Sequence, residues 1–134
     1  YGNFNTALGR SGSNPLGGEE KDFFMRMRSQ GIRYYFVPGA AIRHITPASK
    51  LSEEYFERLT RMIGVSERIR TLGEGKSTFR RRLLAEAVKW GGTLVLATGY
   101  VLRGQAIKGR YLIRMRRNIT QGLLRGMPPA ERDA

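Results

Sequence analysis

A glycine pair in front of an acidic, aromatic run is the feature that most constrains this chain. Gly17-Gly18 is followed by the residues EEKDFFMR, which occupy positions 19–26. Acidic residues are favoured in the first turn of a helix by its dipole, and the apolar residues of the run recur at helical spacing. We therefore predict a short amphipathic helix over residues 19–30, with Gly31 at its end.

Two short apolar runs follow this predicted helix. Residues 32–37 are rich in aromatic and β-branched side chains and end at Pro38, and residues 40–45 form a second run that ends before Pro47. Runs of this composition, bounded by proline and glycine, are typical of strands. We predict two short strands, with the only histidine of the chain, His44, near the end of the second.

The pattern becomes helical from Leu51 onward. Apolar residues then recur every three or four positions to about Arg70, and Ser52 is placed to act as the N-cap. After a polar break near residue 75, a second helix is expected over residues 77–90 with Ser77 as its cap. We use this break to divide the chain into a domain over residues 1–75 and a basic, amphipathic helical extension over residues 76–134.

Composition limits what such a chain can do. Its 134 residues, 40% of them hydrophobic, suffice for one modest core. The absence of cysteine excludes disulfides, thiolate zinc sites and cysteine nucleophiles. Because the chain begins at Tyr1 and not at a methionine, we expect it to be a piece of a longer protein.

The net charge of +13 is distributed unequally. Residues 1–75 contain 11 Lys and Arg against 8 Asp and Glu, whereas residues 76–134 contain 13 against 3. An excess of this kind predicts an anionic partner for the second part, either a phospholipid surface or a nucleic acid.

An apolar stretch within this basic part favours the phospholipid surface. Residues 90–102 are apolar but fall short of the roughly 18–20 residues that a membrane-spanning helix needs. Arginines and lysines flank the stretch on both sides, and aromatic residues lie near its ends. We expect residues 76–126 to lie in the headgroup layer of an anionic leaflet. Binders of nucleic acid seldom add such an apolar stretch, so this observation argues against a nucleic-acid partner.

The acidic run resembles the Gly-Glu-Asp-x-Asp-Leu-x-x-Arg segment of family 2 glycosyltransferases, which are inverting enzymes of the GT-A fold. Residues 4–9 resemble the sequence motif that precedes this segment in the family. Residues 31–38 resemble the strand that follows it, and residues 41–44 are similar to the family's Val-x-His ending. The resemblance covers roughly residues 1–70. It implies an α/β fold, namely the C-terminal portion of a GT-A (nucleotide-diphospho-sugar transferase) domain, here followed by amphipathic basic helices.

The resemblance also implies a role for each polar residue of the site. Glu20 takes the position of the general base that removes the proton of the acceptor hydroxyl, and Asp22 is its nearest substitute. Glu19 and Arg26 are assigned to acceptor binding, Arg26 as an ion-pair partner of the acidic cluster. His44 matches a ligand of the divalent metal, Mn or Mg, that bridges the phosphates of the donor.

The function implied is transfer of a sugar, with inversion, from a nucleotide-sugar donor to a glycan or lipid-linked acceptor. The enzyme is expected to be cytoplasmic and peripheral, at the inner face of the cell membrane. No Asp-x-Asp motif and no nucleotide-binding half occur in the chain, so we expect the isolated chain to be inactive. The alternative is a non-enzymatic basic module that binds an anionic membrane or RNA, in which the acidic run serves only the structure.

Overall fold

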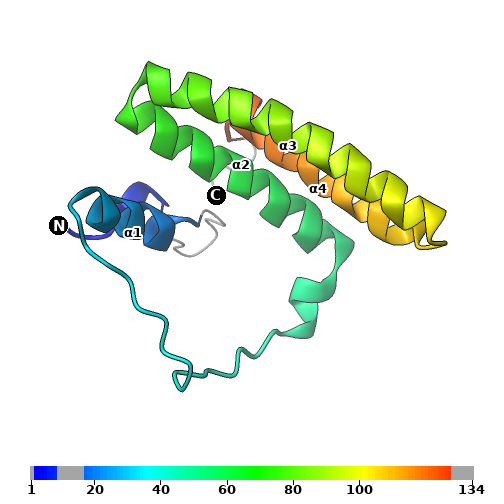
Figure 1. Ribbon diagram of the computed structural model, residues 1–134, viewed down its shortest axis with the longest axis horizontal. Helices are drawn as coiled ribbons and strands as arrows, with labels where there is room; N and C mark the ends of the chain where they lie inside the picture. Colours follow the sequence, from blue (N-terminus) through cyan, green and yellow to red (C-terminus); the bar gives the residue numbers. More distant parts are fainter. Residues whose placement is uncertain (1, 9–16, 128–134) are drawn as a thin grey trace.

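All regular structure in the described part of the chain is helical. The computed structural model describes residues 2–8 and 17–127. It contains the helices α1 (Glu19–Ser29), α2 (Glu53–Glu74), α3 (Lys76–Leu102) and α4 (Ala106–Arg125), together with the short 3-10 helices η1 (Thr6–Leu8) and η2 (Ala48–Leu51). Figure 1 shows α3 and α4 as a long antiparallel pair with α2 beside them and α1 at one end.

The predicted α/β class is wrong, because neither expected strand forms. Residues 32–37 and 40–45 contain no strand, and the same holds for the rest of the described residues. The two runs instead belong to an irregular segment, interrupted by a turn at residues 38–39, that loops away from the helices (Figure 1). Strand propensity reflects packing against neighbouring strands, and no described segment pairs with these residues. Apart from Ile32, their large apolar side chains are exposed, up to 90% for Phe36 and 91% for Ile42.

The predicted helices are present, with some differences at their ends. α1 follows the prediction closely, and Gly31 after it adopts a φ of 82°. Ser52 caps α2 as expected, since its hydroxyl accepts a hydrogen bond from the backbone N–H of Tyr55 at 3.2 Å. The expectation of a helix beginning at a Ser77 cap is wrong, because α3 begins at Lys76 and continues through the apolar stretch to Leu102.

α2 and α4 approach closely because glycines lie where they cross. A Cβ atom on Gly64 would clash with the backbone oxygen of Ile119, and a Cβ on Gly122 would clash with that of Arg61. Met62, Val65 and Leu123 are almost completely buried at the same contact. The two backbones thus approach more closely than any side chain at these two positions would permit.

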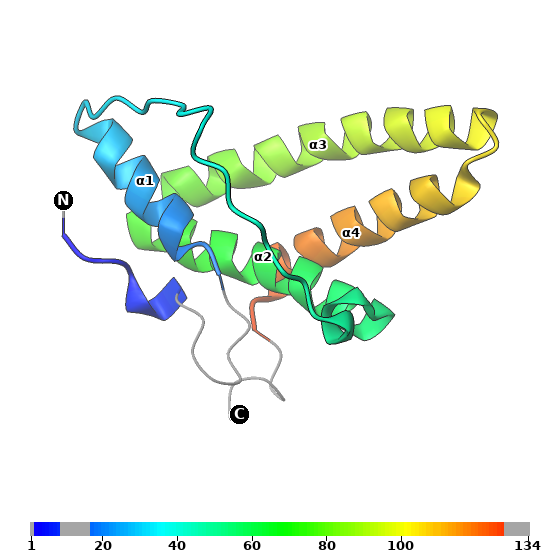
Figure 2. The same ribbon diagram turned by 90° about the horizontal axis from the view of Figure 1, so that it is seen from below.

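The helix α3 contributes little to this core. Ala97 is its only buried apolar residue, and it packs against Gly109 of α4. Figure 2 shows that α3 and α4 meet at the turn between them and separate toward the end where α1 lies. Among the described residues no helix combines the length and apolarity that crossing a membrane requires, which agrees with the prediction for residues 90–102.

The glycine contact gives a direct test of this packing. We predict that Gly122→Ala lowers the free energy of unfolding by about 2 kcal/mol, since the added methyl group forces the two helices apart. Gly92→Ala in α3 is the matched control, because nothing lies within 4 Å of a Cβ at that position. The control should be neutral or more stable, since alanine favours a helix. Equal effects of the two variants in urea denaturation would contradict the close contact.

Candidate functional site

The three carboxylates at the start of α1 have different surroundings. The carboxylate of Glu19 accepts a hydrogen bond from the backbone N–H of Gly18 at 2.9 Å. Asp22 accepts one from Nε of Arg26 at 3.0 Å, one turn further along the helix. Two of the three acidic groups therefore accept hydrogen bonds from α1 or from the residue just before it.

Glu20 is the one carboxylate of the three that has no partner among the described residues. Its side chain is exposed and makes no hydrogen bond or ion pair with any residue in the described part of the chain. Arg26, in contrast, is fully engaged: besides Asp22 it donates to the backbone oxygen of Asn3 at 2.7 Å and lies over the ring of Phe23. The predicted ion-pair role of Arg26 is thus seen, whereas its assignment to acceptor binding stays a prediction.

Among the described residues, His44 is not part of a cluster of metal ligands. It is exposed in the irregular segment that follows α1. Within residues 2–8 and 17–127, no group of three or more His, Asp or Glu side chains is placed to hold a metal ion. The metal-ligand role of His44 stays a prediction that the described residues neither assemble nor complete.

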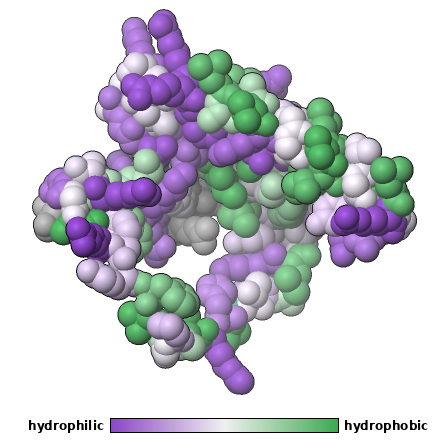
Figure 3. Space-filling view, viewed as in Figure 1, coloured by the Kyte–Doolittle hydropathy of each residue, from purple (hydrophilic) through white to green (hydrophobic). Residues whose placement is uncertain are grey.

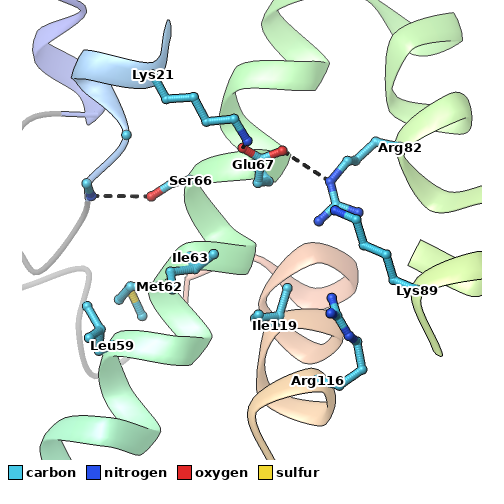
Figure 4. Close-up of a pocket in the computed structure, with 12 residues that line it drawn as sticks. Lys21, Leu59, Met62, Ile63, Ser66, Glu67, Arg82, Lys89, Arg116 and Ile119 are labelled. Atoms are coloured by element: carbon cyan, nitrogen blue, oxygen red, sulfur yellow. Dashed lines mark hydrogen bonds and ion pairs between the residues drawn. The ribbon is translucent and has the colours of Figure 1, made fainter. Parts of the chain in front are cut away.

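A cleft of about 600 Å³ lies between the start of α1 and the three long helices. Four cationic side chains from three helices line it: Lys21, Arg82, Lys89 and Arg116. Figure 4 shows Lys21 reaching from α1 to Glu67 on α2, while Arg82 and Lys89 extend from α3 and Arg116 from α4 toward the same space. The apolar residues of the lining come from α2 and α4.

Glu67 joins three helices at the upper end of this cleft. It is only 8% exposed and accepts hydrogen bonds from Lys21 of α1 at 2.6 Å and from Arg82 of α3 at 3.1 Å. Arg70 on its own helix donates to it as well, at 3.1 Å. Burial by itself raises the pKa of Glu67, but the hydrogen bonds and charges of Lys21 and Arg70 outweigh burial and lower the pKa to about 2.

Glu86 links α3 and α4 in the same way. It is 3% exposed and accepts hydrogen bonds from Arg82 at 2.7 Å and from Arg116 of α4 at 3.1 Å. The hydroxyl of Thr120 donates to the same carboxylate and accepts a hydrogen bond from Nε1 of Trp90. Burial raises the pKa of Glu86, yet the two arginines outweigh this effect and the net shift is downward.

The cleft has more cations than these two carboxylates neutralise. Lys21, Arg82 and Arg116 each form an ion pair with Glu67 or Glu86, whereas Lys89 forms none within the described residues. Desolvation lowers the pKa of Lys89 and the positive charges of Arg82 and Arg116 lower it further, although the negative charge of Glu86 opposes them in part. Lys89 is therefore a cation whose surroundings, on balance, disfavour its positive charge.

A second surface lies on the outer side of α3. Leu84, Val88, Val95 and Leu102 are separated by four or seven residues and so lie along one face of the helix, opposite the buried Glu86, Thr93 and Ala97. All four are more than two-thirds exposed. Figure 3 shows apolar side chains along the edge of the molecule where α3 runs, with hydrophilic side chains between and beside them. Exposed basic residues lie toward both ends of the helix: Arg80, Arg81, Arg103, Lys108 and Arg110.

We compared the chain with models of protein families, with curated proteins and with solved structures, and none of these comparisons gave a match. The resemblance to family 2 glycosyltransferases is accordingly one of short sequence motifs alone.

Sequence reasoning missed the residues that line the cleft. Local spacing alone could have suggested the pairs Glu67–Arg70 and Arg82–Glu86, three and four residues apart on their helices. The links from Lys21 to Glu67 and from Glu86 to Arg116 span 46 and 30 residues, and depend on how the helices pack. No sequence pattern of a single helix carries that information.

The lowered pKa of Glu67 predicts a loss of stability in acid. A carboxyl group whose pKa falls on folding, here from 4.5 to about 2, stabilises the fold above its unfolded pKa and loses this contribution as the pH falls through about 2. The free energy of unfolding should therefore decrease from pH 4.5 downward, and Glu67→Gln should be less stable at pH 7 and show a smaller decrease. Urea denaturation across this range tests the expectation.

The control for this experiment is Glu54→Gln. Glu54 is exposed in the first turn of α2 and has no ion pair within the described residues, so its variant should retain the pH dependence of the unaltered protein. An unaltered pH dependence in Glu67→Gln would show that Glu67 is not the titrating group.

Proposed function

We propose that this chain is the acceptor-side part of an inverting glycosyltransferase that moves a sugar from a nucleotide-sugar donor to a glycan or lipid-linked acceptor. The observation that carries the proposal is the ordered series of motifs from residue 4 to residue 44, with its acidic run at the start of a helix. Inversion needs one carboxylate that is free to accept the proton of the acceptor hydroxyl.

The surroundings of the acidic run support Glu20 in that role. Glu19 and Asp22 are occupied within the helix, and Glu20 alone of the three is exposed without a partner in the described residues. The apolar segment after α1 supports the other part of the proposal, which is that this chain belongs to a larger catalytic domain. Side chains as exposed as those of Phe36 and Ile42 are suited to being covered by other parts of a catalytic domain. The donor site and a bridging Mn or Mg ion would then belong largely to those other parts.

The test is the substitution Glu20→Gln in the full-length protein. Loss of the base should lower kcat by at least about a hundredfold while donor binding stays near normal, because the base acts in the transition state. Glu54→Gln, which also removes one exposed carboxylate near a helix start, should leave turnover unchanged. Full turnover by Glu20→Gln would remove Glu20 from the mechanism, and Asp22→Asn would then test the substitute.

We further propose that α3 rests on an anionic membrane surface through its outer apolar face. The exposed stripe of Leu84, Val88, Val95 and Leu102 supports this, since it is unpaired with any described helix and has arginines and lysines near both ends. A helix with an apolar face and flanking basic residues suits the boundary between headgroups and acyl chains. The enzyme would then be peripheral, at the inner face of the cell membrane, close to a lipid-linked acceptor.

Cosedimentation with lipid vesicles tests this face. Binding to vesicles of phosphatidylcholine with phosphatidylserine should exceed binding to phosphatidylcholine alone, because the basic residues require anionic headgroups. The double variant with Val88→Ser and Val95→Ser should bind the anionic vesicles roughly tenfold more weakly.

The matched control replaces two residues outside α3 that are even more exposed, by Ile42→Ser and Ile45→Ser. It should bind the anionic vesicles as well as the unaltered chain does. Equal losses in the two double variants would show that general hydrophobicity, and not this helix face, determines binding.

A further inference from the structure

The cationic cleft between α1, α2, α3 and α4 has a lining that suits a particular class of ligand. Lys21, Arg82, Lys89 and Arg116 line it together with one carboxylate, that of Glu67. Adding the buried Glu86 leaves four positive charges against two negative ones in the described residues around the cleft. The excess matches the charge of a phosphate monoester, which is close to −2 at neutral pH.

The arrangement of these cations favours an anion among them. Arg82 and Arg116 already point at Glu86 from two helices, and Lys89 extends into the same region without a carboxylate of its own among the described residues. An anionic group beside Lys89 would relieve the repulsion that the three positive charges exert on one another. Arginine and lysine donors that converge from two helices are a common way to bind phosphate.

Part of the lining of the cleft is apolar. It comes from Leu59 and Ile63 of α2 and Ile119 of α4, and Ile63 is 43% exposed. A volume of about 600 Å³ is also larger than a phosphate ion alone requires. A ligand that filled the cleft would place a charged end against the cations and an apolar end against these side chains.

We propose that this cleft binds a phosphate monoester that carries an apolar substituent. The phosphate lies among Lys89, Arg82 and Arg116, and the substituent lies against Ile63 and Leu59. This inference does not depend on the proposed sugar transfer, because it uses neither Glu20 nor His44.

Calorimetric titration of the chain with hexyl phosphate tests the proposal. Hexyl phosphate should bind at least tenfold more tightly than inorganic phosphate, which lacks the apolar part, and than hexanol, which lacks the charge. Equal binding of hexanol and hexyl phosphate would overturn the anion site. Equal binding of inorganic phosphate and hexyl phosphate would overturn the role of the apolar lining.

Two pairs of exposed residues supply matched variants, so that the fold is preserved. Lys89→Gln should weaken hexyl phosphate binding roughly tenfold, whereas Lys76→Gln, which removes the same charge from the same helix outside the cleft, should not. Ile63→Ser should weaken the binding of hexyl phosphate but not that of inorganic phosphate. Leu72→Ser, at a similarly exposed position of α2 outside the cleft, should change neither. Loss of binding in a control to the same extent as in its cleft variant would refute the assigned site.

A displacement experiment then identifies the source of the phosphate ester, a lipid headgroup or a soluble ester. Vesicles that contain phosphatidic acid displace bound hexyl phosphate if the cleft takes a lipid headgroup, and leave it bound if the cleft takes a soluble ester.

Discussion

Glu67 and Glu86 lie inside the helical bundle, where each accepts hydrogen bonds from side chains of neighbouring helices. Together with Lys21, Arg82 and Arg116 they form a chain of alternating charges that crosses from α1 to α4. A buried carboxylate without its partners is costly, by about 3–5 kcal/mol when one partner is removed. The positions of the helices around the cleft therefore depend on keeping both carboxylates paired.

This dependence follows from how little apolar surface the helices bury. The buried apolar residues of the described long helices are Met62, Val65, Ala97, Ile119 and Leu123, and the glycines at the crossing of α2 and α4 allow close contact without large side chains. Polar interactions consequently hold α3 to the rest through one face. The opposite face of α3 keeps its leucines and valines exposed, and this separation of a polar inner face from an apolar outer one is what makes a membrane-facing role for α3 physically reasonable.

Predictions from the sequence were correct for features that depend on neighbouring residues, and they were wrong or missing for features that depend on residues far apart in the chain. Acids in the first turn, Gly31 and the Ser52 cap located α1 and the start of α2, because capping and dipole effects act within one turn. The strand predictions failed because residues 32–37 need a partner strand, which no described residue supplies. The motif residues Glu19, Glu20 and Asp22 could be assigned roles only by resemblance, and their different partners emerged from the structure. The cleft was not foreseen, since Glu67, Glu86 and Arg116 come together only when three helices pack.

The central claim is that the buried carboxylates couple the helices, and a double-mutant cycle between Glu86 and Arg116 tests it most directly. The free energy of unfolding would be measured for Glu86→Gln, for Arg116→Gln and for the variant that carries both changes. The structure predicts a coupling energy of about 1–3 kcal/mol, so that the double variant loses clearly less stability than the sum of the single variants. Strictly additive losses would contradict a direct interaction between α3 and α4 through this pair.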